Sequence, residues 1–399
     1  MNPQIERLHS IASKPERLII GLMSGTSMDG LDIALCACKG SGPSTRISIR
    51  EFITIPYDEE FRSEIKSIFS RRDADLQKVC ILNEVVGTRH AEMILKALDK
   101  WNVNPSQVDL IASHGQTIFH APRILHAEQK YPNATLQIGD GDHIAVRTGI
   151  ITIADFRQKH VAAGGEGAPL AVYGDFLMFS DPSENRVMLN IGGIANFTFL
   201  PSDGDAARVF STDVGPGNTI MDQYIQVHYP GQYYDQDARI SQAGTVSEQL
   251  LAELYSHSFF SSEFPKTTGP ELFNMDYLKA AQQRSGTDSM RHEDVLATLC
   301  MLSARGIIQA VQKCFSAADR VVVYMSGGGM HNPLLVKFLK QGLPDARFKT
   351  TKDLEIDPDA KEAVLFAVLA NETIAGGPID FGQRQGVPSV CMGKICLPN

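Results

Sequence analysis

The segment from Gly21 to Asp32 constrains the fold of this chain more than any other. It reads Gly-Leu-Met-Ser-Gly-Thr-Ser-Met-Asp-Gly-Leu-Asp and lies between two apolar runs, at 18–22 and 31–38. Two apolar runs joined by a glycine-rich turn predict a β-hairpin. Glycine lets the main chain come close to an anion, so the N–H groups and hydroxyls of the tip can hold a phosphate. The carboxylate of Asp29 can hold a metal ion that accompanies the phosphate.

Strand and helix patterns follow this hairpin and then begin again in the second half of the chain. We expect first-half strands or helices at 47–55, 59–69, 76–98, 108–112, 136–145 and 150–154. The second half opens with a strand at 186–190, a Gly192-Gly193 turn and strands at 197–200 and 208–213. Helices at 219–228, 247–256 and 291–315 and a strand at 321–325 complete the pattern. The alternation indicates an α/β protein and suggests an internal duplication.

Length, charge and cysteine usage limit the class of protein. A chain of 399 residues favours two domains, at about 100–200 residues each. The net charge of −9 argues against nucleic acid or an anionic membrane as a partner. The seven cysteines form no Cys-x-x-Cys pair, and residues 1–16 lack the apolar core of a signal peptide. We also see no apolar run near the roughly 20 residues of a membrane span, so we expect a soluble cytoplasmic protein.

The common phosphate-binding and hydrolase motifs are missing from the sequence. It contains no Gly-x-x-x-x-Gly-Lys-Ser/Thr loop and no Gly-x-Gly-x-x-Gly between a strand and a helix. It also contains no Gly-x-Ser-x-Gly elbow. A P-loop, a dinucleotide fold and a serine hydrolase are therefore disfavoured.

Two further glycine segments lie in the second half. Residues 211–219 place a carboxylate at a strand end and a Gly-Pro-Gly turn before a helix. Asn218 or Thr219 could simply cap that helix, but a helix start fed by such a turn is also an anion site. Residues 326–329, Ser-Gly-Gly-Gly, follow a buried strand and allow flat contact with a ligand, which we take to be the adenosine part of a nucleotide.

Catalysis is expected at Asp155, because a carboxylate at the end of a buried strand can act as a general base. The alternative is a structural ion pair with Arg157.

The glycine loop at 162–170 could pack against a sugar. His114, Gln116 and Thr117 follow another short strand and offer hydrogen bonds to a substrate or a loop. A zinc site on His114, His120 and His126 is disfavoured by their six-residue spacing, and Glu362 could be either a ligand or the N3 partner of a helix cap at Asp359.

These motifs together resemble a known family. The string Ser-Gly-Thr-Ser-x-Asp-Gly-x-Asp at 24–32 is similar to the N-terminal signature of the anhydro-N-acetylmuramic acid kinases, in the sugar kinase, Hsp70 and actin superfamily. The segments at 113–117, 154–157, 162–170, 189–198 and 213–218 resemble the family as well. The resemblance runs from Leu18 to about Asn371. It departs at Pro270, where the family often has Arg.

The resemblance implies a two-lobed actin-like ATPase fold of two RNase H-like domains, with the active site in the cleft between them. It implies an N-terminal lobe of residues 1–165 plus 372–399 and a C-terminal lobe of residues 166–371. It implies ATP and Mg²⁺ as cofactors, a 1,6-anhydro sugar from cell-wall recycling as substrate, and a homodimer. In the implied reaction Asp155 deprotonates a water that opens the anhydro bridge, and the freed O6 takes the γ-phosphoryl group.

The resemblance also assigns residues to each part of the site. Nucleotide contacts are expected from Gly25, Thr26, Ser27, Met28, Asp29, Gly30, Leu31, Asp32, Gly192, Gly193, Asn196, Gly215, Gly217, Asn218, Gly327, Gly328, Gly329 and Asn332. Sugar contacts are expected from His114, Gln116, Thr117, Arg157, Gly165 and Glu362. Asp29 and Glu362 are expected at the metal.

Two other functions remain open at this stage. One is a kinase for a different sugar, such as levoglucosan or an ordinary hexose, which would keep the phosphate loops and alter the sugar pocket. The other is a nucleotide-binding scaffold without turnover. Replacing Asp155 by Asn separates them, because only an enzyme would lose turnover while still binding ATP.

Overall fold

The computed structural model divides into two compact units. It describes residues 2–25, 28–128, 130–168, 170–315, 320–382 and 386–399. Unit 1 comprises residues 1–180 and 355–399, and unit 2 comprises residues 181–354. The boundaries at 180 and 355 differ from the expected 165 and 372, because helices α7 (Ala171–Phe179) and α14 (Lys361–Ala375) pack on each other and on the sheet of unit 1.

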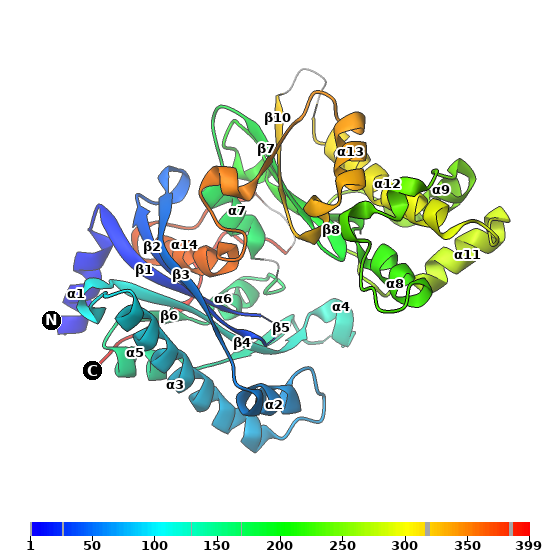
Figure 1. Ribbon diagram of the computed structural model, residues 1–399. Helices are drawn as coiled ribbons and strands as arrows, with labels where there is room; N and C mark the ends of the chain where they lie inside the picture. Colours follow the sequence, from blue (N-terminus) through cyan, green and yellow to red (C-terminus); the bar gives the residue numbers. More distant parts are fainter. Residues whose placement is uncertain (1, 26–27, 129, 169, 316–319, 383–385) are drawn as a thin grey trace. The chain divides into compact units, whose positions relative to one another are not determined.

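Unit 1 is built on a mixed sheet with the order β12-β6-β4-β1-β2-β3 (Figure 1). Its strands are β1 (Glu16–Ser24), β2 (Gly30–Lys39), β3 (Arg46–Pro56), β4 (Leu110–Ala121), β5 (Ala134–Ile138), β6 (Thr152–Ala154) and β12 (Lys394–Cys396). The first three strands are antiparallel, β4 and β6 run parallel to β1, and β12 closes the edge antiparallel to β6. Strand β5 pairs with the far end of β4.

Helices cover both faces of this sheet. They are α1 (Pro3–Ala12), α2 (Glu59–Ile68), α3 (Leu76–Lys100), α4 (Arg123–His126), α5 (Gly141–Thr148), α6 (Phe156–Ala162), α7 and α14. Ile20 and Leu22 of β1 join a core cluster with Leu82 and Val86 of α3, whereas the intervening Gly21 faces α14. This alternation buries both faces of β1, which explains its continuous apolar run.

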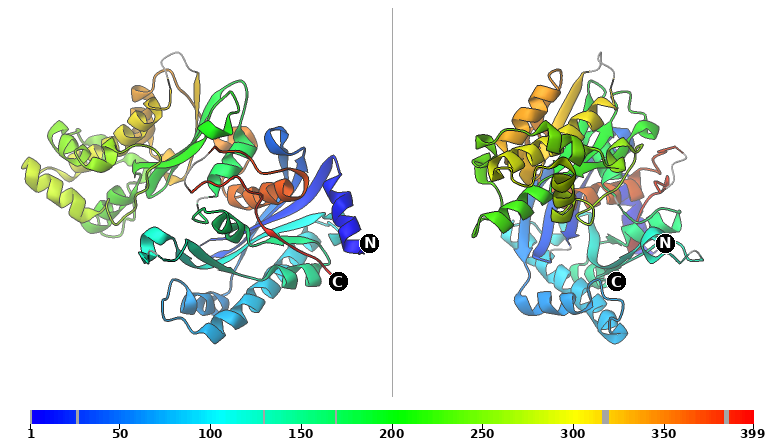
Figure 2. Two further views of the ribbon diagram at one scale, coloured as in Figure 1. Left: turned by 180° about the vertical axis from the view of Figure 1, so that it is seen from behind. Right: turned by 90° about the vertical axis from the view of Figure 1, so that its right-hand side faces the viewer.

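Unit 2 repeats the same design on a five-stranded sheet with the order β11-β10-β7-β8-β9. Its strands are β7 (Asn185–Ile191), β8 (Ile194–Leu200), β9 (Phe210–Pro216), β10 (Val321–Ser326) and β11 (Arg347–Thr350). Its helices are α8 (Thr219–His228), α9 (Glu248–Tyr255), α10 (Ser258–Ser261), α11 (Met275–Ser285), α12 (His292–Gln312) and α13 (Pro333–Gly342). Helix α12 lies among α8, α9 and α13, and Figure 2 shows this packing from two further sides.

The two units share one topology. In each, three antiparallel strands joined in sequence are followed by two strands parallel to the first, in the order 3-2-1-4-5. The first two strands of each unit enclose a glycine-containing turn. The predicted duplication is therefore confirmed at the level of strand order and direction.

The structure corrects two local expectations and shows one helix that the sequence did not predict. Strand β4 continues to Ala121, so Ser113 to Thr117 lie within a strand and do not follow it. Residues 1–16 contain α1, whose first turn is capped by the Asn2 side chain and which lies close to the other end of the chain, since Gln4 donates to the carbonyl of Asn399 (Figure 2). Helix α12 is long and apolar enough to cross a membrane by length and composition, but 72% of that window is buried within the protein.

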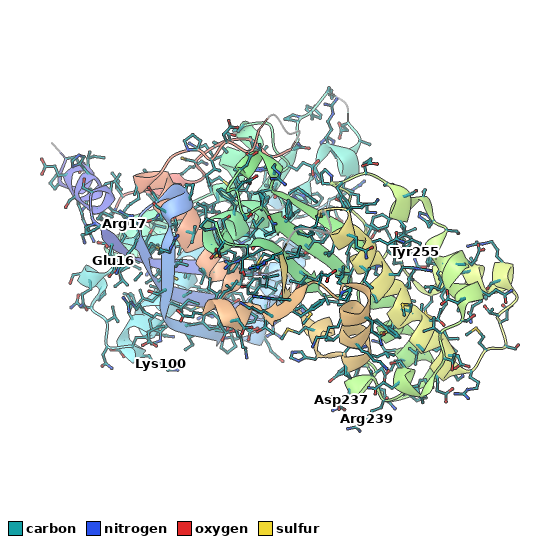
Figure 3. The ribbon with its side chains drawn as sticks, turned by 90° about the horizontal axis from the view of Figure 1, so that it is seen from above. Glu16, Arg17, Lys100, Asp237, Arg239 and Tyr255 are labelled. Atoms are coloured by element: carbon teal, nitrogen blue, oxygen red, sulfur yellow. The ribbon has the colours of Figure 1, made fainter. Side chains whose placement is uncertain are left out.

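Charged side chains lie at the end of the first hairpin that is opposite its turn. Glu16 and Arg17, labelled in Figure 3, are neighbours at the start of β1. Glu16 pairs with Lys39 at 3.1 Å on the surface, whereas Arg17 is buried and donates to Asn371 of α14 at 2.7 Å. The buried arginine therefore joins the base of the hairpin to the helix that covers it.

Helix α14 approaches β1 so closely that only glycine fits at position 21. A Cβ added to Gly21 would lie 1.9 Å from the carbonyl oxygen of Ala363, which is a backbone atom and cannot move aside alone. We predict that Gly21→Ala lowers the free energy of unfolding by about 1–3 kcal/mol. Chemical denaturation measures this. Gly377→Ala is the matched control, because nothing lies within 4 Å of its added Cβ; equal losses in both variants would contradict the prediction.

Candidate active site

The loop between β1 and β2 carries the expected first phosphate hairpin. Thr26 and Ser27 lie outside the described residues. The N–H of Met28 donates to the carbonyl of Gly25 at 3.3 Å, and Met28 has a φ of 58°. Asp29 is exposed. The side chains of Met28 and Leu31, in contrast, are buried in the core of unit 1, so either residue could meet a nucleotide only through its main chain.

Gly30 and Asp32 stand at the start of β2. A Cβ on Gly30 would lie 2.4 Å from the carbonyl oxygen of Ile55, so strand pairing alone requires this glycine. Asp32 accepts a hydrogen bond of 2.5 Å from the Thr54 hydroxyl. Partial burial raises the pKa of Asp32, and the charges of Asp359 and Asp29 raise it further. The hydrogen bond from Thr54 acts in the opposite direction and lowers it. Several carboxylates therefore influence one another near this hairpin.

Arg157 and His114 form a buried pair in unit 1. The Nε of Arg157 donates to Nε2 of His114 at 2.8 Å, and its Nη1 donates to the carbonyl of Gly167 at 2.7 Å. Because a guanidinium can only donate, Nε2 of His114 is the bare nitrogen, and Nδ1 carries the proton toward the Gly115 carbonyl at 2.9 Å. Burial and then the Arg157 charge lower the pKa of His114 to about 3. The ring is therefore neutral, and its two nitrogens are both occupied.

Glu362 lies in the first turn of α14. Ala360 is the N-cap of that helix and makes no side-chain cap, so the alternative that Glu362 is the N3 partner of a cap at Asp359 is wrong. The Glu362 side chain reaches solvent, but partial desolvation raises its pKa, while the charges of Arg157 and Lys361 act in the opposite direction. Glu362 thus faces the arginine that orders His114 and remains accessible to a ligand.

Asp155 follows β6 in the left-handed region, with a φ of 58° and a ψ of 37°. Its Oδ2 accepts a hydrogen bond of 2.8 Å from Nζ of Lys394, which β12 brings alongside because Lys394 pairs with Ala154. The alternative that Asp155 forms an ion pair with Arg157 is therefore wrong. The Asp155 side chain is 35% exposed and can be reached from solvent.

The remaining predicted sugar contacts are partly used within the protein. Gln116 is buried and bonds to Ser24 and Gly25, and the Thr117 hydroxyl accepts from Gln137 at 3.2 Å. A Cβ on Gly165 would lie 2.1 Å from the ring of His160, so this glycine allows the loop to pack on that ring. Gln116 and Gly165 therefore shape the loops around the site, whatever they contribute to a ligand.

A metal at this site would need ligands besides protein side chains. Among the described residues, no group of three or more His, Cys, Asp or Glu side chains is placed to hold a metal ion. Mg²⁺ is usually held by one or two carboxylates together with substrate phosphates and water. Asp29 and Glu362 each interact electrostatically with Asp32, and this donor set fits such an ion.

Three glycine segments converge in unit 2. Main-chain bonds run from Gly217 and Thr219 to the Gly193 carbonyl, at 2.8 and 3.1 Å, and from Asn218 to the Gly192 carbonyl at 2.9 Å. The β7–β8 turn is thereby joined to the first turn of α8. A Cβ on Gly217 would lie 2.2 Å from the oxygen of Gly192. Asn218 is the N-cap residue of α8 but its side chain makes no cap hydrogen bond, so the alternative that this side chain caps the helix is wrong.

The segment after β10 packs on the same turn. A Cβ on Gly327, which has a φ of 81°, would lie 2.7 Å from the Ile191 carbonyl oxygen, and one on Gly329 would lie 2.3 Å from the Ile191 side chain. Gly192, Gly193 and Gly328, in contrast, have no heavy atom within 3.5 Å of an added Cβ. The structure thus brings the predicted segments at 192–193, 217–218 and 327–329 together.

Other predicted nucleotide contacts in unit 2 have structural partners. The Asn332 side chain caps α13, accepting from the N–H groups of Leu334 and Leu335 at 3.1 and 3.0 Å. Gly215 has a φ of 145°, and its added Cβ would lie 3.0 Å from the Phe260 ring. Asn196 lies at a register shift between β8 and β9. Each can be explained by local structure, and their contacts with a nucleotide remain predictions.

Two charged residues escaped the sequence-based prediction. Lys394, which bonds to Asp155, comes from a three-residue edge strand more than 200 positions away, and no motif marks it. Asp222 lies in the first turn of α8, four residues after Asn218, and burial raises its pKa from 3.8 to about 6. Its position one helical turn after Asn218 could have marked Asp222 in the sequence as a neighbour of the glycine segment. A perturbed carboxylate beside the glycine segments is a candidate functional group.

The fold and these sites define a class of protein. Two units with the same α/β topology, each with a glycine-containing turn between its first two strands, agree with the sugar kinase fold that the sequence leads us to expect. The family model of the anhydro-N-acetylmuramic acid kinases matches residues 17–396. The chain belongs to this family.

Relatives of the chain agree with that assignment along their whole length. An anhydro-N-acetylmuramic acid kinase of Pseudoalteromonas atlantica is 54% identical and covers 100% of both chains. That of Pseudoalteromonas translucida is 51% identical over 99% of both chains. That of Caldanaerobacter subterraneus is 40% identical over 98% of this chain and 100% of its own.

The raised pKa of Asp222 predicts a pH-dependent stability. The native state binds this proton more tightly than the unfolded chain, so Asp222 lowers stability progressively as the pH rises from about 4 to about 6. We predict that Asp222→Asn is more stable than the parent protein above pH 6 and that the difference shrinks toward pH 4. Chemical denaturation across this range, with exposed Asp288→Asn as control, measures it; a pH-independent difference would refute the assignment.

Proposed function

We propose that this protein is an ATP-dependent kinase that opens the anhydro ring of 1,6-anhydro-N-acetylmuramic acid and phosphorylates O6. The products are N-acetylmuramic acid 6-phosphate and ADP, in the recycling of cell-wall peptidoglycan. The observation that carries this proposal is the family match over residues 17–396, because it takes in every motif from the first hairpin to the end of the chain. The reaction places the protein in the cytoplasm with its soluble substrates.

The chemistry falls to a small set of residues in unit 1. Asp155 accepts a proton from water, the water oxygen attacks the anomeric carbon, and the bond from that carbon to O6 breaks. The freed O6 attacks the γ-phosphorus, and ADP leaves. The location of Asp155 after a buried strand, with one carboxylate oxygen bonded to Lys394 and the side chain open to solvent, supports its role as the base.

Arg157 and Glu362 are proposed to bind the sugar, and His114, whose two ring nitrogens are occupied, is proposed to hold Arg157 in place. His114 is held neutral, and Arg157 is held by two bonds, so the pair is ordered before a ligand arrives. Preordered polar groups lose little freedom on binding, which favours both affinity and orientation. Glu362 can accept hydrogen bonds from sugar hydroxyls at the start of α14.

The phosphates are proposed to meet the main chain of both glycine-containing turns. The loop at Gly25 and Gly30 would supply one set of N–H groups, and Gly192, Gly193 and Gly328, where an added Cβ would meet no atom within 3.5 Å, would supply the other. Asp29 and Glu362 would hold Mg²⁺, which neutralises charge on the phosphates during transfer. Phosphoryl transfer depends mainly on positioning and charge neutralisation, so a site of this kind needs no lysine of the P-loop type.

Release of ADP with ATP and Mg²⁺ tests the proposal directly. We expect turnover with 1,6-anhydro-N-acetylmuramic acid and none with levoglucosan or N-acetylglucosamine. Turnover with levoglucosan would show that the protein is a kinase for a different sugar. If the protein binds ATP but releases no ADP with any of the three sugars, the result would favour the non-catalytic alternative.

Asp155→Asn is the decisive variant. It keeps the size of the side chain and removes the base, so we predict a fall in kcat of about 10²–10⁴-fold with ADP affinity unchanged. Kinetics and calorimetric titration with ADP measure the two effects. The exposed Asp73→Asn serves as control and should match the parent protein. Full activity in Asp155→Asn would remove Asp155 from the mechanism.

A further inference from the structure

We propose that Tyr57 and His90 are positioning residues for the first phosphate loop, which they hold through Ser24 and Gln116. Neither residue belongs to a motif of the sequence, and neither contacts a predicted ligand group directly. The inference rests on the proposed function of this loop in binding the nucleotide. It is carried by a continuous path of buried hydrogen bonds from helix α3 to Gly25.

The path joins four side chains from different elements. Nε2 of His90 on α3 lies 2.8 Å from the hydroxyl of Tyr57, which follows β3. That hydroxyl donates to Oγ of Ser24 at 2.9 Å, and Ser24 donates to Oε1 of Gln116 on β4 at 2.6 Å. Gln116 then donates from Nε2 to the carbonyl of Gly25 at 3.2 Å. All four side chains are at most 5% exposed.

The direction of every proton in this path is determined. Nε2 of Gln116 faces two carbonyl oxygens, those of Gly25 and Thr117, so its Oε1 must face Ser24. Ser24 therefore donates its only proton to Gln116 at 2.6 Å, a much shorter contact than its 3.4 Å to the Gly30 carbonyl, and Tyr57 donates its own proton to Ser24. The Tyr57 oxygen is then left to accept from His90, which must carry its proton on Nε2. A rotation of any one group would oppose two donors or two acceptors, so the four groups keep a single arrangement.

Burial keeps the path in this state. It lowers the pKa of His90 to about 3 and raises that of Tyr57, so neither group changes its charge near neutral pH. Nδ1 of His90 has no hydrogen-bond partner among the described residues, and an unsatisfied buried nitrogen costs stability. A network that stabilised the core alone would be replaced at little cost by apolar side chains. Its termination on the main chain of the phosphate loop supplies a reason for keeping it.

The path acts where β1 ends and the loop begins. Beyond the loop, Met28 and Leu31 lie in the core and Gly30 pairs with β3. On the side of β1, Ser24 lies opposite Gln116 in the β1–β4 register and its hydroxyl is 3.4 Å from the Gly30 carbonyl. Gly25 is held by the Gln116 side chain and by the 3.3 Å bond from Met28. Loss of the Tyr57 hydroxyl would leave Ser24 without its donor and free the hydroxyl of Ser24 to turn.

Tyr57→Phe tests the proposal. The ring and its edge contact with Phe61, at 4.8 Å between centroids, are retained, and only the bridging oxygen is lost. We expect ADP affinity to fall and KM for ATP to rise, each about tenfold, which corresponds to about 1.4 kcal/mol, with KM for the sugar unchanged. Calorimetric titration with ADP needs no turnover, so it tests the path even if the proposed sugar chemistry fails.

Matched variants separate positioning from stability. Tyr277→Phe removes a hydroxyl that donates to the Leu254 carbonyl in unit 2, and it should lower the melting temperature without changing ADP affinity. His90→Gln keeps an N–H donor and should retain more ADP affinity than His90→Leu. Parent-like ADP affinity in Tyr57→Phe, with a melting temperature lowered as in Tyr277→Phe, would overturn the proposal. Equal affinities in the two His90 variants would overturn it too.

Discussion

The close contact between strand β1 and helix α14 is the constraint on which unit 1 depends. Gly21 faces the Ala363 carbonyl with no room for a side chain, and Arg17 bonds to Asn371 further along the same helix. Strand β1 ends in the first phosphate loop, and α14 begins with Glu362. Packing two backbones directly against each other therefore fixes a proposed phosphate-binding loop and a proposed sugar-binding carboxylate in one rigid body, because side chains that could change rotamer do not intervene.

Charge in the same unit is ordered in a complementary way. Arg157 stands between a neutral His114 and the carboxylate of Glu362, and burial raises the pKa of the carboxylate while lowering that of the imidazole. The charges of Asp359 and Asp29 raise the pKa of Asp32, and the charge of Asp32 raises the pKa of Glu362. The carboxylates of Asp29, Asp32, Asp359 and Glu362 outnumber Arg157 and Lys361, the cations that act on Glu362, so negative charge remains uncompensated. This is the electrostatic condition under which a divalent cation binds and brings an anionic nucleotide with it.

The sequence predicted those features that depend on local pattern. Apolar runs beside glycine turns located the strands at 16–24, 30–39 and 185–200, and helix α8 was predicted with its observed ends. Features that depend on distant pairing were missed. Lys394 reaches Asp155 only because β12 joins β6, and Tyr57 and His90 meet Ser24 only after α3 packs on the sheet. Met28 and Leu31 match a motif that faces a ligand, yet the side chains of both lie in the core. Leu31 lies in β2, where alternate positions point to opposite faces of the sheet, whereas Met28 lies in the loop before that strand.

The glycines of unit 2 separate into two kinds when neighbouring atoms are considered. Gly217, Gly327 and Gly329 would collide with the β7–β8 turn if they carried a Cβ, so packing alone explains their identity. At Gly192, Gly193 and Gly328 an added Cβ would meet its nearest neighbour at an ordinary contact distance of 3.6, 3.7 and 3.8 Å, and none of the three has a positive φ. Neither the fold nor the backbone conformation requires glycine at these three positions. A ligand that must lie flat against the main chain does require it, which is why we assign the nucleotide phosphates to these residues and treat the others as their support.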